Sequence, residues 1–184
     1  FRVQSHLQEC HGRGLVDHLT LPPVLRPAPD SCRDAVVVGA VGAPGLRRDL
    51  LAAWPGNRFT TVVSSGAHVD PQCTIDVGCV IAPGVVITTD VTIGAHCHLN
   101  IGATISHDTQ LGSFVTVCPG AHIAGNVTIG DGVFVGIGAN ISHGVTVAPG
   151  VTIGAGATVL SDITTECAVV VGVPARVVKI SEGW

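Results

Sequence analysis

The stretch Ile129-Gly-Asp-Gly-Val-Phe-Val-Gly-Ile-Gly-Ala-Asn-Ile141 contains the pattern that decides the fold, an aliphatic residue at every sixth position. The same spacing continues without a miss from Val69 to Val159. A second apolar position follows each of these residues four places later, and of the sixteen only Thr109 carries a hydroxyl. A unit of six residues is too short for an α-helix and suits one short strand and a turn. The repeat therefore predicts triangular coils of about 18 residues, stacked as a parallel β-helix.

The repeat also predicts which side chains face the inside of the coils. We expect the two apolar residues of each unit to point inward and to stack on their equivalents 18 residues on, at a strand spacing of about 4.8 Å. Cys79 and Cys97 are such a pair, and we expect buried free thiols rather than a disulfide. A β-sandwich with chance spacing does not account for sixteen consecutive matches.

The segments on either side of the repeat predict a chain of three parts. Residues 1–66 are expected to form a small α/β domain, complete or truncated, because a buried strand (34–39), a helix (44–53) and a second strand (59–63) follow one another as in a βαβ unit. The helix carries Leu46, Leu50 and Leu51 on one face. Residues 67–164 form the β-helix. Residues 165–184 are expected to cap its last coil.

Composition narrows the class of protein further. Charged residues make up 12% of the chain, against about 25% in typical domains, which predicts that faces of the prism are buried in an oligomer. The net charge of −4 argues against a nucleic-acid partner. No apolar run approaches the ~20 residues of a membrane span, and no secretory signal is seen. The seven cysteines contain no C-x-x-C pair, which favours a cytoplasmic protein without a zinc clip. The chain has no methionine, which suggests a processed or trimmed sequence.

Histidines are the first candidates for chemistry. Five of the nine lie within the repeat: His96, His98, His107, His122 and His143. A zinc site like that of γ-class carbonic anhydrases needs histidines from neighbouring coils, two of them five residues apart, and no two of these five have that spacing. We therefore expect no metal site. A structural role is the simplest interpretation of every histidine except His107.

His107 differs because Asp108 follows it directly on a predicted corner of a coil. A carboxylate beside an imidazole polarises the ring, and a histidine pKa near 6.5 suits proton removal at neutral pH. Gly125 lies 18 residues later, so it should stack directly on His107. Its backbone N–H is a candidate donor to an oxyanion. The pattern indicates a general base beside a donor for developing negative charge.

From about residue 34 to its end, the chain resembles the bacterial sugar O- and N-acyltransferases of the sialic-acid O-acetyltransferase and bacillosamine N-acetyltransferase family. The segments that carry the resemblance are residues 39–47, His107-Asp108, Pro119-Gly-Ala121, Ala124-Gly-Asn-Val127, Ile129-Gly-Asp-Gly-Val-Phe134, Ile153-Gly-Ala-Gly-Ala157 and Gly172-Val-Pro-Ala-Arg176. The resemblance implies a left-handed β-helix and a homotrimer with acetyl-CoA in the cleft between adjacent prisms.

The resemblance also implies roles for single residues. His107 would remove a proton from an amine or hydroxyl of a sugar, Asp108 would polarise the ring, and the Gly125 N–H would donate to the thioester oxygen. Acetyl-CoA would contact Thr116, Gly125, Asn126 and Ile137. Thr116 stands where the family usually has a second histidine that touches the cofactor. The glycine-rich turn that usually opens the family's nucleotide-binding half is absent from residues 1–33.

The distribution of basic residues predicts where the phosphates of CoA bind. Residues 59–175 contain no lysine or arginine. The pyrophosphate and the 3′-phosphate are therefore expected near Arg176 and Lys179, which follow the last coil.

The sequence thus predicts an acetyl-CoA-dependent acyltransferase that acts on an amino or hydroxyl group of a sugar, with or without a linked nucleotide. Two alternatives stay open. One is the same chemistry on a non-sugar acceptor, such as an amino acid or an antibiotic intermediate. The other is a non-catalytic β-helix that serves as a scaffold or binding module.

Overall fold

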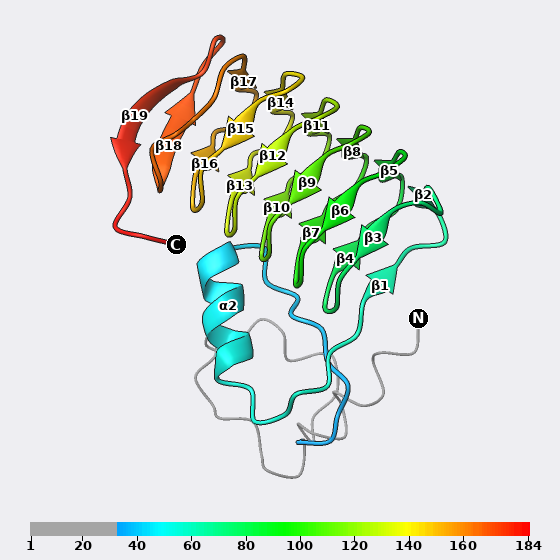
Figure 1. The fold of residues 1–184 in the computed structure, drawn as a ribbon. Coiled ribbons are helices and arrows are strands. Elements are labelled where there is room, and N and C mark those ends of the chain that lie inside the picture. Colours follow the sequence, from blue (N-terminus) through cyan, green and yellow to red (C-terminus); the bar gives the residue numbers. More distant parts are fainter. Residues whose placement is uncertain (1–32) are drawn as a thin grey trace, which may run out of the picture.

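The computed structural model describes residues 33–184. Its main body is a three-sided stack of coils, and each side is a sheet of short strands (Figure 1). The largest side, the eight-stranded sheet, contains in spatial order β1 (Val62–Val63), β4 (Val80–Ile81), β7 (His98–Leu99), β10 (Thr116–Val117), β13 (Phe134–Val135), β16 (Thr152–Ile153), β18 (Ala168–Val171) and β19 (Arg176–Ile180).

The other two sides have six and five strands. The six-stranded sheet contains β2 (His68–Val69), β5 (Val86–Ile87), β8 (Thr104–Ile105), β11 (His122–Ile123), β14 (Asn140–Ile141) and β17 (Thr158–Val159). The five-stranded sheet contains β3 (Thr74–Ile75), β6 (Thr92–Ile93), β9 (Gln110–Leu111), β12 (Thr128–Ile129) and β15 (Thr146–Val147). Strands from β1 to β17 pair in parallel with partners 18 residues away, as Val117 does with Val135. This register confirms the predicted β-helix.

The core is the column of side chains that the repeat predicts to point inward. From Ile81 to Val159, the aliphatic residue at every sixth position is buried. Val69 and Ile75 are only partly buried, because their strands β2 and β3 begin their sheets and have a neighbouring coil on one side only. Cys79 and Cys97 are free thiols, as expected, and lie on adjacent coils with 3.4 Å between Cys79 Sγ and Cys97 N.

The segment before the prism differs in part from its prediction. The helix is present as α2 (Pro44–Ala52). The strand expected at 34–39 is reduced to a single parallel bridge between Val37 and Phe59, and the second strand forms at Val62–Val63 as part of the prism. The apolar face expected on the helix is only partly formed, because Leu50 and Leu51 are half-buried. Leu46 is exposed, whereas Arg47 is fully buried, because this side of α2 faces backbone carbonyls of the coils rather than an apolar surface.

The C-terminal part closes the eight-stranded sheet. Strands β18 and β19 form an antiparallel pair beside β16, and the chain then returns toward α2 (Figure 1). The ring of Trp184 occupies space that a side chain at Gly132 or Gly150 would fill. Residues 33–184 contain no helix with the length and apolar character needed to cross a membrane.

Candidate active site

His107 and Asp108 form a turn between β8 and β9, at the corner where the six-stranded and five-stranded sheets meet. His107 Nδ1 lies 2.7 Å from Asp108 Oδ2, and Asp108 adopts a left-handed φ of 57°. With the Nδ1–H donating to the carboxylate, Nε2 keeps its lone pair, as a general base requires. Both side chains are more than half exposed, 53% and 60% respectively. The hydrogen-bonded pair is therefore present in a single chain, where it remains exposed to solvent.

Gly125 lies directly against the imidazole. A Cβ built on Gly125 would be 2.6 Å from both Cε1 and Nε2 of His107, so any side chain here would displace the ring. Asn126, with φ 55°, donates its backbone N–H to the His107 carbonyl at 2.8 Å. The ring of His143 follows on the same corner, with 6.4 Å between the two ring centroids. The structure thus brings the predicted residues His107, Asp108, Gly125 and Asn126 together, and it buries Gly125 beneath the ring.

Two other histidines, His98 and the half-buried His96, pack against the segment that precedes the prism. His98, on β7, is almost completely buried, and its Nε2 lies 2.5 Å from the Gly39 carbonyl. Burial, followed by the nearby positive charge of Arg47, lowers the pKa of His98 to about 4, so the neutral ring donates to that carbonyl. His96 lies between two phenylalanine rings, and burial lowers its pKa as well. Both side chains serve packing between the N-terminal segment and the prism.

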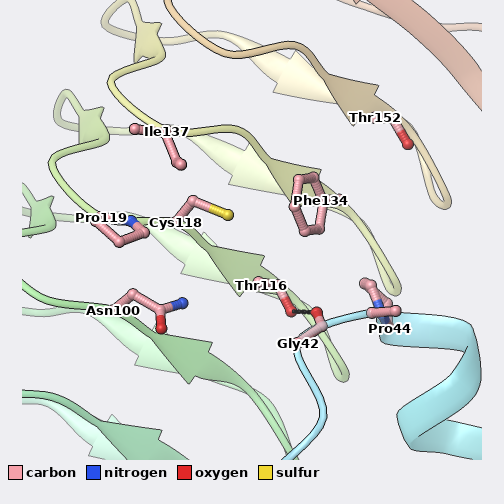
Figure 2. Close-up of a pocket in the computed structure, with 10 residues that line it drawn as sticks. Gly42, Pro44, Asn100, Thr116, Cys118, Pro119, Phe134, Ile137 and Thr152 are labelled. Carbon is pink, nitrogen blue, oxygen red and sulfur yellow. Dashed lines mark hydrogen bonds between the residues drawn. The ribbon is translucent and has the colours of Figure 1, made fainter.

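A groove lies on the eight-stranded sheet, where the start of α2 approaches it (Figure 2). Its volume is about 530 Å³, within the range of small-molecule sites. One wall comes from the chain just before and at the start of α2, and the floor comes from successive coils. The lining residues are Gly42, Ala43, Pro44, Asn100, Thr116, Cys118, Pro119, Phe134, Ile137 and Thr152. Two residues predicted to contact the cofactor, Thr116 and Ile137, therefore lie here.

Thr116 has a structural contact that the sequence does not indicate. Its side chain is buried, and its hydroxyl donates to the Gly42 carbonyl at 2.7 Å. The same oxygen accepts from Arg47 Nη1 at 3.0 Å. Its hydroxyl therefore fastens the wall of the groove to its floor, as the dashed line in Figure 2 shows for Gly42.

Arg47 is the main residue that sequence reasoning missed. Its guanidinium donates to the carbonyls of Val41 at 2.6 Å, Phe114 at 2.7 Å and His96 at 2.9 Å. Burial lowers its pKa to about 10, so it stays charged at neutral pH. Arg47 therefore anchors α2 to the coils. The only available signal was its place in a segment that resembles the family, since the spacing of the sequence marks it as an ordinary helix residue.

The His107 corner and the groove lie on opposite sides of the prism. The corner joins the six-stranded and five-stranded sheets, whereas the groove covers the eight-stranded sheet. A single chain therefore does not bring His107 to Thr116 or Ile137. Arg176 and Lys179 lie exposed on β19, the edge strand of the sheet that carries the groove. Among the described residues, no three of His, Cys, Asp or Glu cluster closely enough to hold a metal ion.

A parallel β-helix of hexapeptide repeats defines a class of transferases, and comparison with known proteins agrees. The family described as bacterial transferase hexapeptide (six repeats) matches residues 126–161. No match was found among curated protein sequences.

Solved structures give more extensive similarity. PerB from Caulobacter crescentus, determined with CoA and GDP-perosamine, has 32% identity and a TM-score of 0.72, and the match covers 75% of this chain and 67% of PerB. The acetyltransferase domain of PglB from Neisseria gonorrhoeae has 33% identity and a TM-score of 0.73, covering 78% and 70%. WeeI from Acinetobacter baumannii has 29% identity and a TM-score of 0.75, also covering 78% and 70%. The chain thus spans about two thirds of the length of these proteins.

The chain therefore belongs to the hexapeptide-repeat transferases, and within them to the acetyl-CoA-dependent sugar acyltransferases with a β-helix. It is accordingly an enzyme of the acyltransferase class, which sets aside the non-catalytic scaffold.

Proposed function

We propose that this protein transfers the acetyl group of acetyl-CoA to an amino group of a nucleotide-linked sugar, with His107 as the general base. The single observation that carries the proposal is the His107–Asp108 pair at 2.7 Å on a corner of the β-helix. An amine acceptor, rather than a hydroxyl or a non-sugar, is supported by similarity to PerB, whose structure contains GDP-perosamine. A cytoplasmic location is part of the proposal, because acetyl-CoA is supplied there.

The reaction follows from the arrangement at the corner. The acceptor nitrogen, as a neutral amine, attacks the thioester carbon, and His107 Nε2 takes the proton that the nitrogen loses. Asp108 holds the Nδ1–H and stabilises the imidazolium that forms. The thioester oxygen becomes an oxyanion, and we assign the Gly125 N–H as its donor. The carbon–sulfur bond then breaks, the amide forms, and the CoA thiolate leaves and is protonated.

Acetyl-CoA is proposed to lie in the groove, with its phosphates toward β19. Thr116, Phe134 and Thr152 form a row across the eight-stranded sheet. The row continues through Val169 to Lys179. From Thr152 to Lys179 is two strand spacings, about 10 Å. The groove thus leads along one face of the sheet toward Lys179 and Arg176, which supports the proposed position of the phosphates.

A homotrimer is proposed because one chain keeps the two halves of the site apart. In a trimer whose threefold axis is parallel to the prism axis, equivalent coils of the three copies lie at the same level along that axis. The His107 corner of one copy can then face the groove of the next. An exposed apolar ridge supports such packing, since large exposed apolar patches mark interaction surfaces. It runs along the corner between the eight-stranded and six-stranded sheets, and its members, 18 residues apart, are Pro83, Ile101, Pro119, Ile137 and Ala155.

Two measurements test this proposal. Acetyl-CoA and a panel of nucleotide-linked amino sugars are incubated with the enzyme, CoA thiol release is followed, and products are identified by mass. Matched sugars with a hydroxyl in place of the amine are the control acceptors. We expect thiol release and one added acetyl group only with an amine. Absence of turnover over the whole panel would contradict the proposed acceptor. Light scattering is expected to give a trimer, and a stable monomer at micromolar concentration would contradict the shared site.

A further inference from the structure

Thr109 is the one hydroxyl among the sixteen small inward positions of the repeat, and its side chain is fully buried. A hydroxyl in an apolar core is unfavourable unless it is hydrogen-bonded. Thr109 Oγ1 donates to the Ala124 carbonyl at 3.0 Å, and it accepts from the Val127 N–H at 3.3 Å. These two partners belong to the coil that stacks on its own, and a longer contact of 3.5 Å joins the hydroxyl to the His107 carbonyl. The hydroxyl therefore joins two coils from inside the core.

The two partners of Thr109 flank the Gly125–Asn126 turn, on which the ring of His107 lies. Ala124 precedes the turn and Val127 follows it. Thr109 thus holds both ends of the turn from within, while Asn126 N–H is bonded to the His107 carbonyl at the corner. The His107 ring lies so close to Gly125 that a Cβ there would be 2.6 Å from Nε2. A shift of this turn therefore moves the surface on which the ring lies.

A bond from a small inward side chain to a backbone carbonyl of the next coil also occurs at a cysteine. Two coils earlier on the same corner, Cys73 Sγ donates to the Thr88 carbonyl at 2.8 Å. At the equivalent positions between and after these two residues the chain has Val91 and Val127, which carry no polar side-chain atom. Among the residues the structure describes, the bond from Thr109 is therefore the only one of this type that reaches the Gly125–Asn126 turn. Cys73 reaches the turn on the opposite side of Asp108, whose N–H donates to the Thr89 carbonyl at 3.3 Å, and provides a matched control.

We infer that Thr109 is a positioning residue of the acyl transfer, whose hydroxyl fixes the Gly125–Asn126 turn and thereby the orientation of the His107 imidazole. It acts through the turn and touches no substrate. The inference rests on the proposed function, because it concerns the base that this function uses. Catalytic groups must be held within about 0.5 Å of their productive geometry, and a misplacement of 1 Å can cost about 10²-fold in rate. A rigid turn beneath the ring meets that requirement.

The test compares Thr109→Val, Thr109→Ser and Cys73→Val. We expect Thr109→Val to lower kcat by about tenfold or more with KM for acetyl-CoA within about twofold of wild type. Thr109→Ser keeps the hydroxyl and is expected to restore kcat, and Cys73→Val to leave it unchanged. A second readout needs no acceptor. The ¹⁵N spectrum of His107 in wild type is expected to show the proton on Nδ1, and Thr109→Val is expected to reduce that tautomer.

A merely structural role would give a different result. Thr109→Val would then lower the unfolding midpoint while kcat of the folded protein and the His107 tautomer stay at wild-type values, and this outcome overturns the inference. If Thr109→Val does not fold, Thr109→Ala and Thr109→Ser carry the test: equal kcat and equal spectra overturn it. Activity in His107→Ala would instead overturn the proposed function. Loss of activity in His107→Ala with wild-type behaviour of Thr109→Val would overturn this inference alone.

Discussion

Replacing Arg47 by methionine is expected to release the N-terminal segment from the prism while the coils stay folded. Methionine keeps much of the aliphatic volume and removes the guanidinium. Three backbone carbonyls then lose donors that lie 2.6 to 2.9 Å away. Hydrogen bonds to charged groups contribute about 1.5–3 kcal/mol each, and bonds within one network do not add fully. We expect a loss of about 3–5 kcal/mol, confined to the contact between α2 and the coils.

Hydrogen exchange followed by mass spectrometry measures this loss by segment. A loss of 3 kcal/mol corresponds to about 10²-fold faster exchange when opening is local. We expect this acceleration in peptides covering residues 36–60 and little change in peptides covering 120–160, whose core is formed by the coils alone. Because Arg47 also holds Gly42 at the wall of the groove, KM for acetyl-CoA is expected to rise in the same variant.

Arg48→Met is the matched control on the same helix. The side chain of Arg48 is 42% exposed, lies 3.0 Å from the Asp49 carboxylate and stacks over Trp184 at 4.8 Å. Such surface contacts contribute about 1 kcal/mol or less each, so exchange is expected to change little. Arg47→Lys is expected to be intermediate, because lysine has the charge but not the planar fork of donors. Equal exchange in Arg47→Met and Arg48→Met would refute the anchoring role.

The remaining predictions concern pH, the turn beneath the base and the phosphates. Below pH 6.5 the unfolded protein takes up a proton on His98 that the folded protein resists until about pH 4, so stability falls as the pH drops through this range, by up to about 3 kcal/mol. His98→Gln is expected to flatten that dependence in urea unfolding, and an unchanged slope would assign it to other groups. Gly125→Ala is expected to displace the ring of His107 and lower kcat by roughly 10- to 100-fold at nearly unchanged stability; a wild-type kcat would show that this ring position is not used. Arg176→Ala combined with Lys179→Ala is expected to raise KM for acetyl-CoA by roughly fivefold per lost phosphate contact, about 1 kcal/mol each, and to weaken its salt dependence. If both quantities stay at wild-type values, the phosphates bind elsewhere.

The sequence predicted the prism well because the repeat directly determines which side chains face inward. A residue 18 positions from another must stack on it, so the pairing of Val117 with Val135 follows from counting. The candidate base could be predicted from the sequence for the same reason, since His107 and Asp108 are neighbours in the chain and Gly125 is one coil away.

The anchoring of the N-terminal segment was not predictable in this way. Arg47 binds carbonyls that lie 49 and 67 residues further along the chain, and a backbone carbonyl leaves no mark in the sequence. The strand expected at 34–39 was wrong because a short apolar run forms a strand only where a partner strand lies beside it. Here only Val37 pairs, in a single bridge with Phe59. The groove depends on this anchoring, so it too appears only in the structure.

The central claim is that His107 is the base, and the most direct measurement is kcat of His107→Ala beside His143→Ala. The two rings lie on the same corner, with 6.4 Å between their centroids, so the control tests any general effect of removing an imidazole there. We expect His107→Ala to lower kcat by about 10²–10⁴-fold, with unchanged CoA affinity and folding, and His143→Ala to stay near wild type. A His107→Ala enzyme that turns over acetyl-CoA and acceptor at the wild-type rate would contradict the account.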